Sequence, residues 1–137
     1  MNLPKALEPL ENELAFKSIW DIYAYIDSLG IELVEANLPP GEKGFFYQDA
    51  EHKVIFISEK MLIAEKRVTA VHELVHAILH EDTGAFLLAN KINWSRFEYE
   101  ARVYTARLLI PKNELIKMLE MEYSIYEIAE EFQVTEE

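Results

Sequence analysis

This chain contains no cysteine, which excludes disulfides and thiolate metal sites. Any metal that it binds must therefore be held by histidine and carboxylate side chains. Long apolar runs are also missing: none reaches the roughly 18 residues of a membrane-spanning helix, and no basic leader with an apolar core follows Met1. The lack of cysteine is typical of a reducing compartment, so we expect a cytoplasmic protein without a membrane anchor.

Basic residues are scarce too, with 13 lysines and arginines against 25 aspartates and glutamates, for a formal net charge of −12. A surface with this excess of negative charge is repelled by nucleic-acid phosphates, which argues against direct DNA binding. Half of the residues are hydrophobic, which suffices for one core in a chain of 137 residues. We therefore predict a single domain over 1–137, in which 1–12 form a loose lead-in and 112–137 a C-terminal helical extension.

The spacing of apolar residues predicts an α+β fold, in which a small, mostly antiparallel sheet packs against helices. The sheet comes from a short strand at 31–34 and a β-hairpin of 45–48 and 53–58. If the 53–58 strand lies at an edge, an extended substrate could pair with it. Helices are predicted at 13–29, from a start between 59 and 66 to an end near 82–84, at 94–110, at 113–120, and after the capping box Ser124–Glu127. In residues 84–93 the apolar residues show neither helical nor strand periodicity.

The most informative stretch is Val68–His80, which contains the pattern His-Glu-x-x-His at 72–76. On a helix, residues four apart lie on the same face, so His72 and His76 can bind one ion. Zinc in a hydrolytic site takes three protein ligands and a water, and Glu73 is placed to accept the proton of that water. The ionisable residues fall on one side of this helix and the apolar residues on the other, which favours a metal site over an ordinary solvated face.

Two further side chains could line the same cleft. His80 lies one turn beyond His76 on the polar side, where it either lines the cleft or is a solvated residue at the helix end. Tyr104 could reach a developing oxyanion, although aromatic residues in such positions more often belong to the core. The sequence leaves both roles open.

The third ligand must come from another segment, and the 94–110 helix offers Glu98 and Glu100. Glu98 falls on the apolar side of that helix, where a carboxylate is costly to bury unless it is paired or bound to a metal. Glu100 falls on the opposite side beside Arg96, as in a solvated ion pair. The position on the helix therefore favours Glu98 as the third ligand, while Glu100 remains a candidate. In the alternative interpretation, Ser95 begins the helix and Glu98 only completes a capping box.

These two motifs together resemble the ImmA/IrrE family of zinc metallopeptidase domains. The second motif of that family is a glutamate, a small residue three positions on, an aromatic residue, alanines and a Leu-Leu-x-Pro ending. This chain matches it at Glu98, Ala101, Tyr104, Ala106, Leu108, Leu109 and Pro111. It departs from the usual family residues at Val75 (glycine), Tyr104 (phenylalanine) and Thr105 (alanine). The resemblance covers residues from about 20 to 111.

The resemblance implies a zincin-like fold with its metal site between two helices. In a gluzincin-like site, His72, His76 and Glu98 would hold Zn²⁺, and Glu73 would be the general base. Family members commonly occur in phages and mobile elements, where they cleave or inactivate a helix-turn-helix repressor. We therefore expect a zinc-dependent endopeptidase whose protein substrate is a transcriptional repressor. The alternative is a zinc-containing binding module that relieves repression by docking without proteolysis.

Overall fold

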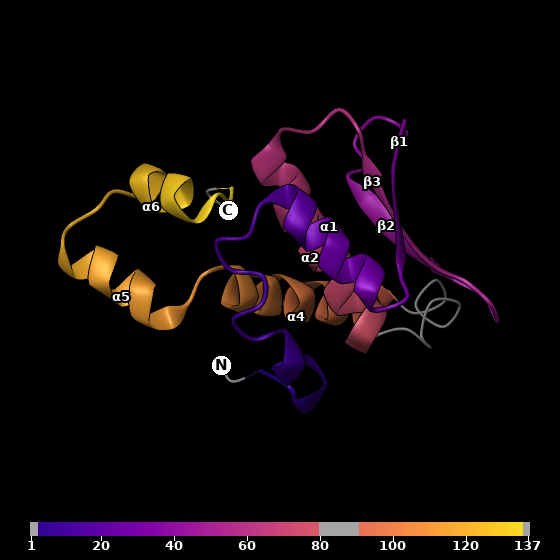
Figure 1. The fold of residues 1–137 in the computed structure, drawn as a ribbon, viewed down its shortest axis with the longest axis horizontal. Coiled ribbons are helices and arrows are strands. Elements are labelled where there is room, and N and C mark those ends of the chain that lie inside the picture. Colours follow the sequence, from indigo (N-terminus) through magenta and orange to yellow (C-terminus); the bar gives the residue numbers. More distant parts are fainter. Residues whose placement is uncertain (1–2, 80–90, 136–137) are drawn as a thin grey trace.

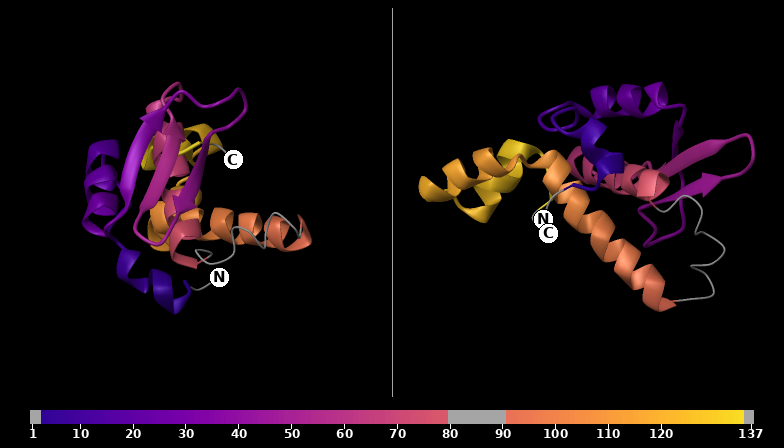
Figure 2. Two further views of the ribbon diagram at one scale, coloured as in Figure 1. Left: turned by 90° about the vertical axis from the view of Figure 1, so that its right-hand side faces the viewer. Right: turned by 90° about the horizontal axis from the view of Figure 1, so that it is seen from below.

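A computed structural model describes residues 3–79 and 91–135, without the side chains of 91–95. Its elements in chain order are η1 (Lys5–Leu10), α1 (Ile19–Ser28), β1 (Glu32–Ala36), β2 (Gly44–Gln48), β3 (Lys53–Ser58), α2 (Ile63–Leu79), α4 (Lys91–Leu109), α5 (Lys112–Glu120) and α6 (Ile125–Phe132). The helices lie on one side of a small sheet (Figures 1 and 2), which confirms the α+β class.

The three strands form a mixed sheet in the order β1–β3–β2. β1 runs parallel to β3, whereas β2 runs antiparallel to it. The hairpin is therefore confirmed, but the prediction of a mostly antiparallel sheet is wrong. Apolar alternation identifies strands and not their neighbours, and here the chain after β1 passes to the far side of β3 before β2 begins. Because β3 is paired on both sides, the hypothesis that it could accept a substrate strand is also wrong.

Helix α2 lies between α1 and α4 and forms the centre of the fold (Figures 1 and 2). Its Val71, Leu74 and Val75 are completely buried, in one hydrophobic cluster with Ile55 and Ile57 of β3. Burying each such side chain contributes roughly 1.5–3 kcal/mol. With its apolar side fixed in this way, α2 must turn its ionisable side toward α4 and the start of β2.

The N-terminal segment differs from the prediction. Lys5–Leu10 forms the 3-10 helix η1, and Leu7, Leu10 and Leu14 are buried in the core. The interpretation of 1–12 as a loose lead-in is therefore wrong for its described part. Polar residues and prolines surround these leucines in the sequence, so their regular spacing is only a weak signal of a buried segment.

Helix α1 is shorter than the predicted 13–29. It begins at Ile19, after Ser18, whose Oγ accepts a hydrogen bond from the backbone N–H of Asp21 at 3.1 Å. Such a side-chain cap satisfies one of the free donors at a helix start. Phe16 has a φ of 63°, a left-handed conformation that no α-helix continues through. Its ring instead packs against that of Phe132 near the C-terminus, with 5.3 Å between the ring centroids and a tilt of 38°.

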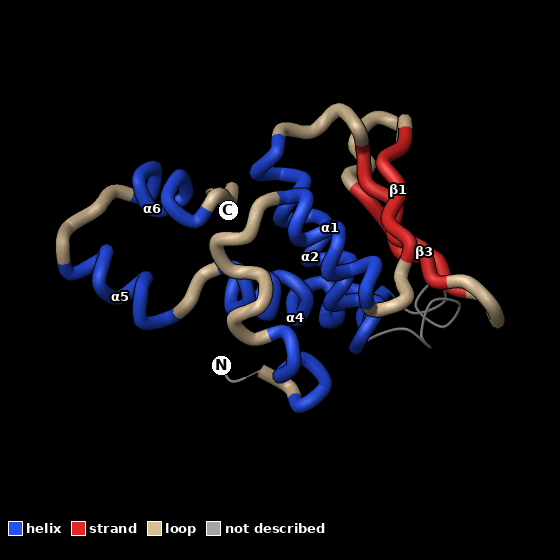
Figure 3. The backbone as a smooth tube through the Cα atoms, viewed as in Figure 1, coloured by secondary structure: helices blue, strands red, loops and turns tan. Residues whose placement is uncertain are grey.

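The two C-terminal helices α5 and α6 project away from the sheet, and the end of α6 returns to the body of the molecule (Figure 3). The predicted capping box is present, with both hydrogen bonds between Ser124 and Glu127. Phe132, the last residue of α6, is completely buried. Whether 112–137 belong to one domain with the rest stays a prediction. Within the described residues, no helix has the length and apolarity needed to cross a membrane.

Candidate metal centre

The motif helix begins at Ile63, inside the predicted interval, and its predicted end near 82–84 lies outside the described residues. It carries His72 and His76 one turn apart on the same face. Their rings are 4.8 Å apart between centroids and nearly perpendicular, at 78°. His76 is buried and His72 is half-buried. Both imidazoles therefore have restricted surroundings, which suits residues that must hold one orientation.

The second helix of the site starts earlier than the sequence predicts. Helix α4 begins at Lys91 rather than Trp94, so Ser95 lies inside it and cannot be its cap. This rules out the capping-box interpretation of Glu98, which sits two turns into the helix. Arg96 and Glu100 form the expected pair four residues apart, with 3.4 Å between Nε and Oε1. The two glutamates thus lie on different faces of α4, as predicted.

Packing of α4 against α2 brings Glu98 to both histidines. Its Oε2 lies 3.1 Å from Nε2 of His72, and its Oε1 lies 2.8 Å from Nε2 of His76. One ligand atom from each of the three residues lies within 4.8 Å of the other two. The three side chains thus meet at one point, although Glu98 is at least 22 positions away from the two histidines in the chain.

The donor set fits a metal ion. Neighbouring ligand atoms of a tetrahedral zinc site are about 3.3 Å apart when the bonds are about 2.0 Å long, close to the two nitrogen–oxygen separations here. Two imidazoles and one carboxylate leave a fourth position for water. In the absence of a cation, each Nε2 must carry a proton to face the carboxylate, since lone pairs repel. The geometry therefore admits a metal, and it does not by itself select zinc among divalent ions.

Electrostatics distinguish the two carboxylates. Glu73 is only 9% exposed, and this burial raises the pKa of its carboxyl, although the neighbouring His76 and His72 partly counteract it. Burial acts in the same direction on Glu98, but hydrogen bonds and charge from His72 and His76 outweigh it and hold the pKa of Glu98 well below its usual range. Glu98 therefore stays ionised, as a metal ligand would have to, while the raised pKa of Glu73 makes it the carboxyl that more readily takes up a proton.

Three other residues that the sequence analysis singled out lie in different places. His80 lies outside the described residues. Tyr104 is half-buried and packs against the hydrophobic core, so its role at the cleft stays a prediction. Val75, where the family usually has glycine, is completely buried in that core.

Arg67 is a buried residue that sequence reasoning missed. Its Nε donates to the Lys17 carbonyl at 2.9 Å, and its Nη1 donates to the carbonyls of Phe132, at 2.7 Å, and Gln133. A signal existed: on a helical wheel Arg67 falls about 220° from His72, among the apolar residues of α2. A cation on that side must find partners, and here it joins α2 to the end of α6.

In a comparison with protein families, residues 26–137 match the Peptidase_M78 family model, described as the IrrE N-terminal-like domain. The comparison with curated proteins found no match. Among solved structures, the chain is similar to a Mycobacterium tuberculosis transcriptional regulator, at a TM-score of 0.71 and 15% identity. That similarity covers 96% of this chain and 43% of the regulator, so the chain spans less than half of its length.

Proposed function

Because the chain belongs to the Peptidase_M78 family of IrrE N-terminal-like domains, we propose that it is a zinc-dependent endopeptidase that cleaves or inactivates a transcriptional repressor. The observation that carries the proposal is the convergence of His72, His76 and Glu98. These residues come from the two motifs that are typical of such peptidases. Their separations of 3.1 and 2.8 Å also suit ligands of a common ion.

In this proposal His72, His76 and Glu98 hold Zn²⁺. When bound, the ion would polarise the scissile carbonyl and lower the pKa of a water molecule. Glu73 lies next to the first ligand on α2 and accepts the proton of the attacking water, then passes it to the leaving amine. Its buried carboxyl suits this double role, because burial raises its pKa and so eases protonation.

The proposed substrate is a helix-turn-helix repressor, which places the reaction in the cytoplasm. The structurally similar M. tuberculosis protein is named a transcriptional regulator. The net charge of −12 suits a basic protein partner, and DNA-binding proteins carry basic surfaces. Repulsion from phosphates would also keep this chain off the DNA to which its substrate binds.

A second candidate is a zinc-containing module that inactivates its repressor by docking alone. Exposed apolar side chains on and beside α5 and α6 favour it: Ile116, Leu119, Met121, Tyr123, Ile125 and Tyr126. Exposed apolar residues that gather in this way often mark protein contacts. Docking at this surface could accompany proteolysis or replace it.

Replacement of Glu73 separates the two candidates. Zinc-loaded wild type, Glu73→Gln and His72→Ala are each incubated with tryptic peptides of a bacterial lysate, and new termini are identified by mass spectrometry. Proteolysis predicts cleavage by wild type only, with Glu73→Gln still holding one zinc per chain. In parallel, transcripts are compared in cells that express each variant. Derepression that survives Glu73→Gln supports docking, and equal cleavage by wild type and Glu73→Gln contradicts the proposed role of Glu73.

A further inference from the structure

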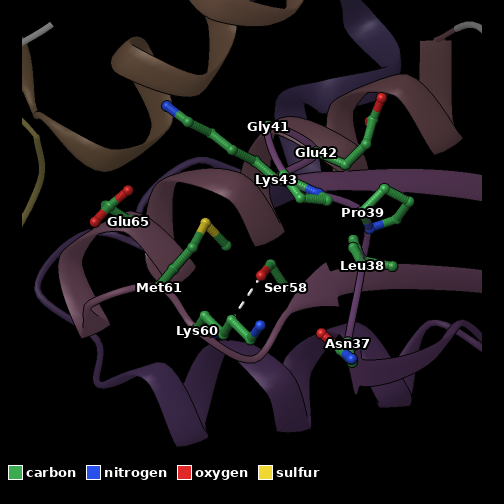
Figure 4. A pocket seen from close by; sticks show the side chains of 11 residues that line it. Asn37, Leu38, Pro39, Gly41, Glu42, Lys43, Ser58, Lys60, Met61 and Glu65 are labelled. Atoms are coloured by element: carbon green, nitrogen blue, oxygen red, sulfur yellow. Dashed lines mark hydrogen bonds between the residues drawn. The ribbon is translucent and has the colours of Figure 1, made fainter.

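A cavity of about 700 Å³ lies beside the N-terminal part of α2. It is formed by the loop between β1 and β2, by the end of β3 with the connection that follows it, and by the first turn of α2 (Figure 4). Volumes of about 300–1,000 Å³ are typical of ligand-binding pockets. It is large enough for a bulky side chain together with part of its backbone.

The cavity and the candidate metal centre share one face of α2. Glu65, which lines the cavity, is followed at helical spacing by Thr69, His72 and His76. Met61, another lining residue, contacts Thr69 with 3.7 Å between Sδ and Oγ1. His72 lies seven positions after Glu65, which corresponds to about 10 Å along the helix axis. The cavity and the candidate metal centre thus lie about two turns apart on one face of α2, with the buried Thr69 between them.

The cavity lining combines an apolar part with charged side chains. Leu38, Pro39 and Met61 supply apolar surface, and the thioether of Met61 points into the cavity (Figure 4). Two lysines and two glutamates also line it, so their formal charges cancel. Such a site binds an apolar side chain through its hydrophobic part and gives no net preference for either sign of charge.

We propose that this cavity is a specificity pocket for the polypeptide substrate, and that it takes a large apolar side chain such as leucine, methionine or phenylalanine. An extended peptide advances about 3.3 Å per residue, so one bound at the metal centre reaches the cavity two or three residues from the scissile bond. This inference rests on the proposed peptidase function, since it uses the metal centre as the origin of the peptide.

A binding experiment tests the pocket separately from catalysis. Zinc-loaded Glu73→Gln protein is immobilised, the tryptic peptides of a bacterial lysate are passed over it, and the retained peptides are sequenced. The same is done with Met61→Trp, which narrows the cavity with a larger side chain, and Leu38→Asp, which places a charge in its apolar part, each in the Glu73→Gln background. Leu62→Trp is the matched control, because Leu62 is adjacent to Met61, 73% exposed and not part of the lining.

Retention of peptides rich in large apolar residues is expected for the parent and for Leu62→Trp. Both cavity variants should lower that enrichment at least about 10-fold while keeping one zinc per chain and the parental melting temperature. Equal enrichment in all four proteins would contradict the proposal that the cavity binds an apolar side chain of the substrate. Two cavity variants are used because Met61→Trp could fail to fold. Leu38 is only half-buried, so Leu38→Asp should still fold. Failure of cleavage by wild type, with binding as expected, would contradict the peptidase function and leave the pocket in place as a peptide-binding site.

Discussion

His76 and Glu98 are 22 positions apart in the chain, yet Nε2 of the first lies 2.8 Å from Oε1 of the second. This contact joins α2 to α4 at the point where the two sequence motifs meet. A carboxylate on the inward face of α4 has a reason to be there only if it meets a cation or a donor. The pair His72 and His76 provides donors, and a bound metal would provide the cation.

The two glutamates of α4 should differ sharply in their effect on metal binding. Glu98→Gln removes the charged ligand, and we expect the zinc affinity to fall by more than the roughly 10- to 100-fold that loss of an outer-sphere partner causes. Glu100→Gln changes the same residue type two positions away and should leave the affinity within about twofold of wild type. Competition with a chromogenic chelator measures both. Equal losses in the two variants would show that facing on α4 does not select the ligand.

Arg67 should contribute to stability without contacting the candidate metal centre. Arg67→Met removes the donors that serve the carbonyls of Lys17, Phe132 and Gln133. Charge-assisted hydrogen bonds of this kind are worth about 1.5–3 kcal/mol each. Because burial of the guanidinium costs a large part of that gain, we expect a net loss of about 3 kcal/mol in the free energy of unfolding.

The control for this variant is Arg107→Ala, which removes a partly exposed arginine whose Nη2 lies 3.6 Å from Glu11 and should change stability by less than about 1 kcal/mol. Denaturant unfolding measures both variants. Hydrogen exchange should also accelerate in residues 125–135 of the Arg67→Met protein, because the end of α6 loses its attachment. Unchanged exchange there would contradict the role assigned to Arg67.

Tyr23 should make the fold sensitive to alkaline pH. Its hydroxyl donates to Oε2 of Glu35 at 3.1 Å, and burial, the charge of Glu35 and this hydrogen bond together raise the pKa of Tyr23. The Tyr23 hydroxyl keeps its proton to higher pH in the folded state than in the unfolded state, where its pKa is about 10. The free energy of unfolding is therefore unaffected below pH 10 and falls as pH rises toward the folded-state pKa. Wild type should therefore lose stability relative to Tyr23→Phe progressively as pH rises above about 10, toward the raised folded-state pKa. Tyr126→Phe, at an exposed position, should show a constant difference in melting temperature.

Gly44 should not tolerate a side chain. A Cβ at this position would lie 2.7 Å from the carbonyl oxygen of Phe56 and 2.9 Å from Cγ2 of Thr69. The first of these atoms is backbone of the paired strand and cannot move away alone. Gly44→Ala should destabilise the protein by about 1–3 kcal/mol and shift β2 away from α2. An unchanged melting temperature would show that β2 packs less closely on α2 than described.

Much of this site could be predicted from the sequence because it depends on local periodicity. The spacing of His72 and His76, and the facing of Glu98 and Glu100, are properties of single helices. The arrangement of the strands could not be predicted in the same way, because the pattern in 31–36 is compatible with either neighbour and either direction. Pairing depends on contacts with distant parts of the chain, and a short strand contains little information about them.

Long-range packing also explains the other differences. Leu7 and Leu10 stand among polar residues and prolines, and their burial depends on a surface formed by distant helices. Arg67 needs carbonyl partners from both ends of the chain. The cavity beside Met61 is formed by two stretches that are separated in the chain, 37–43 and 58–65. In each case, the sequence indicates the chemical character of the residues and leaves their partners undetermined.

X-ray absorption at the zinc edge, combined with anomalous diffraction from crystals of the zinc-loaded protein, tests the central claim most directly. We predict one zinc ion per chain, bound by Nε2 of His72, Nε2 of His76 and a carboxylate oxygen of Glu98, with metal–ligand distances of about 2.0–2.2 Å. An ion bound elsewhere, or a protein that keeps these three side chains together but binds no zinc at micromolar concentration, would contradict the account.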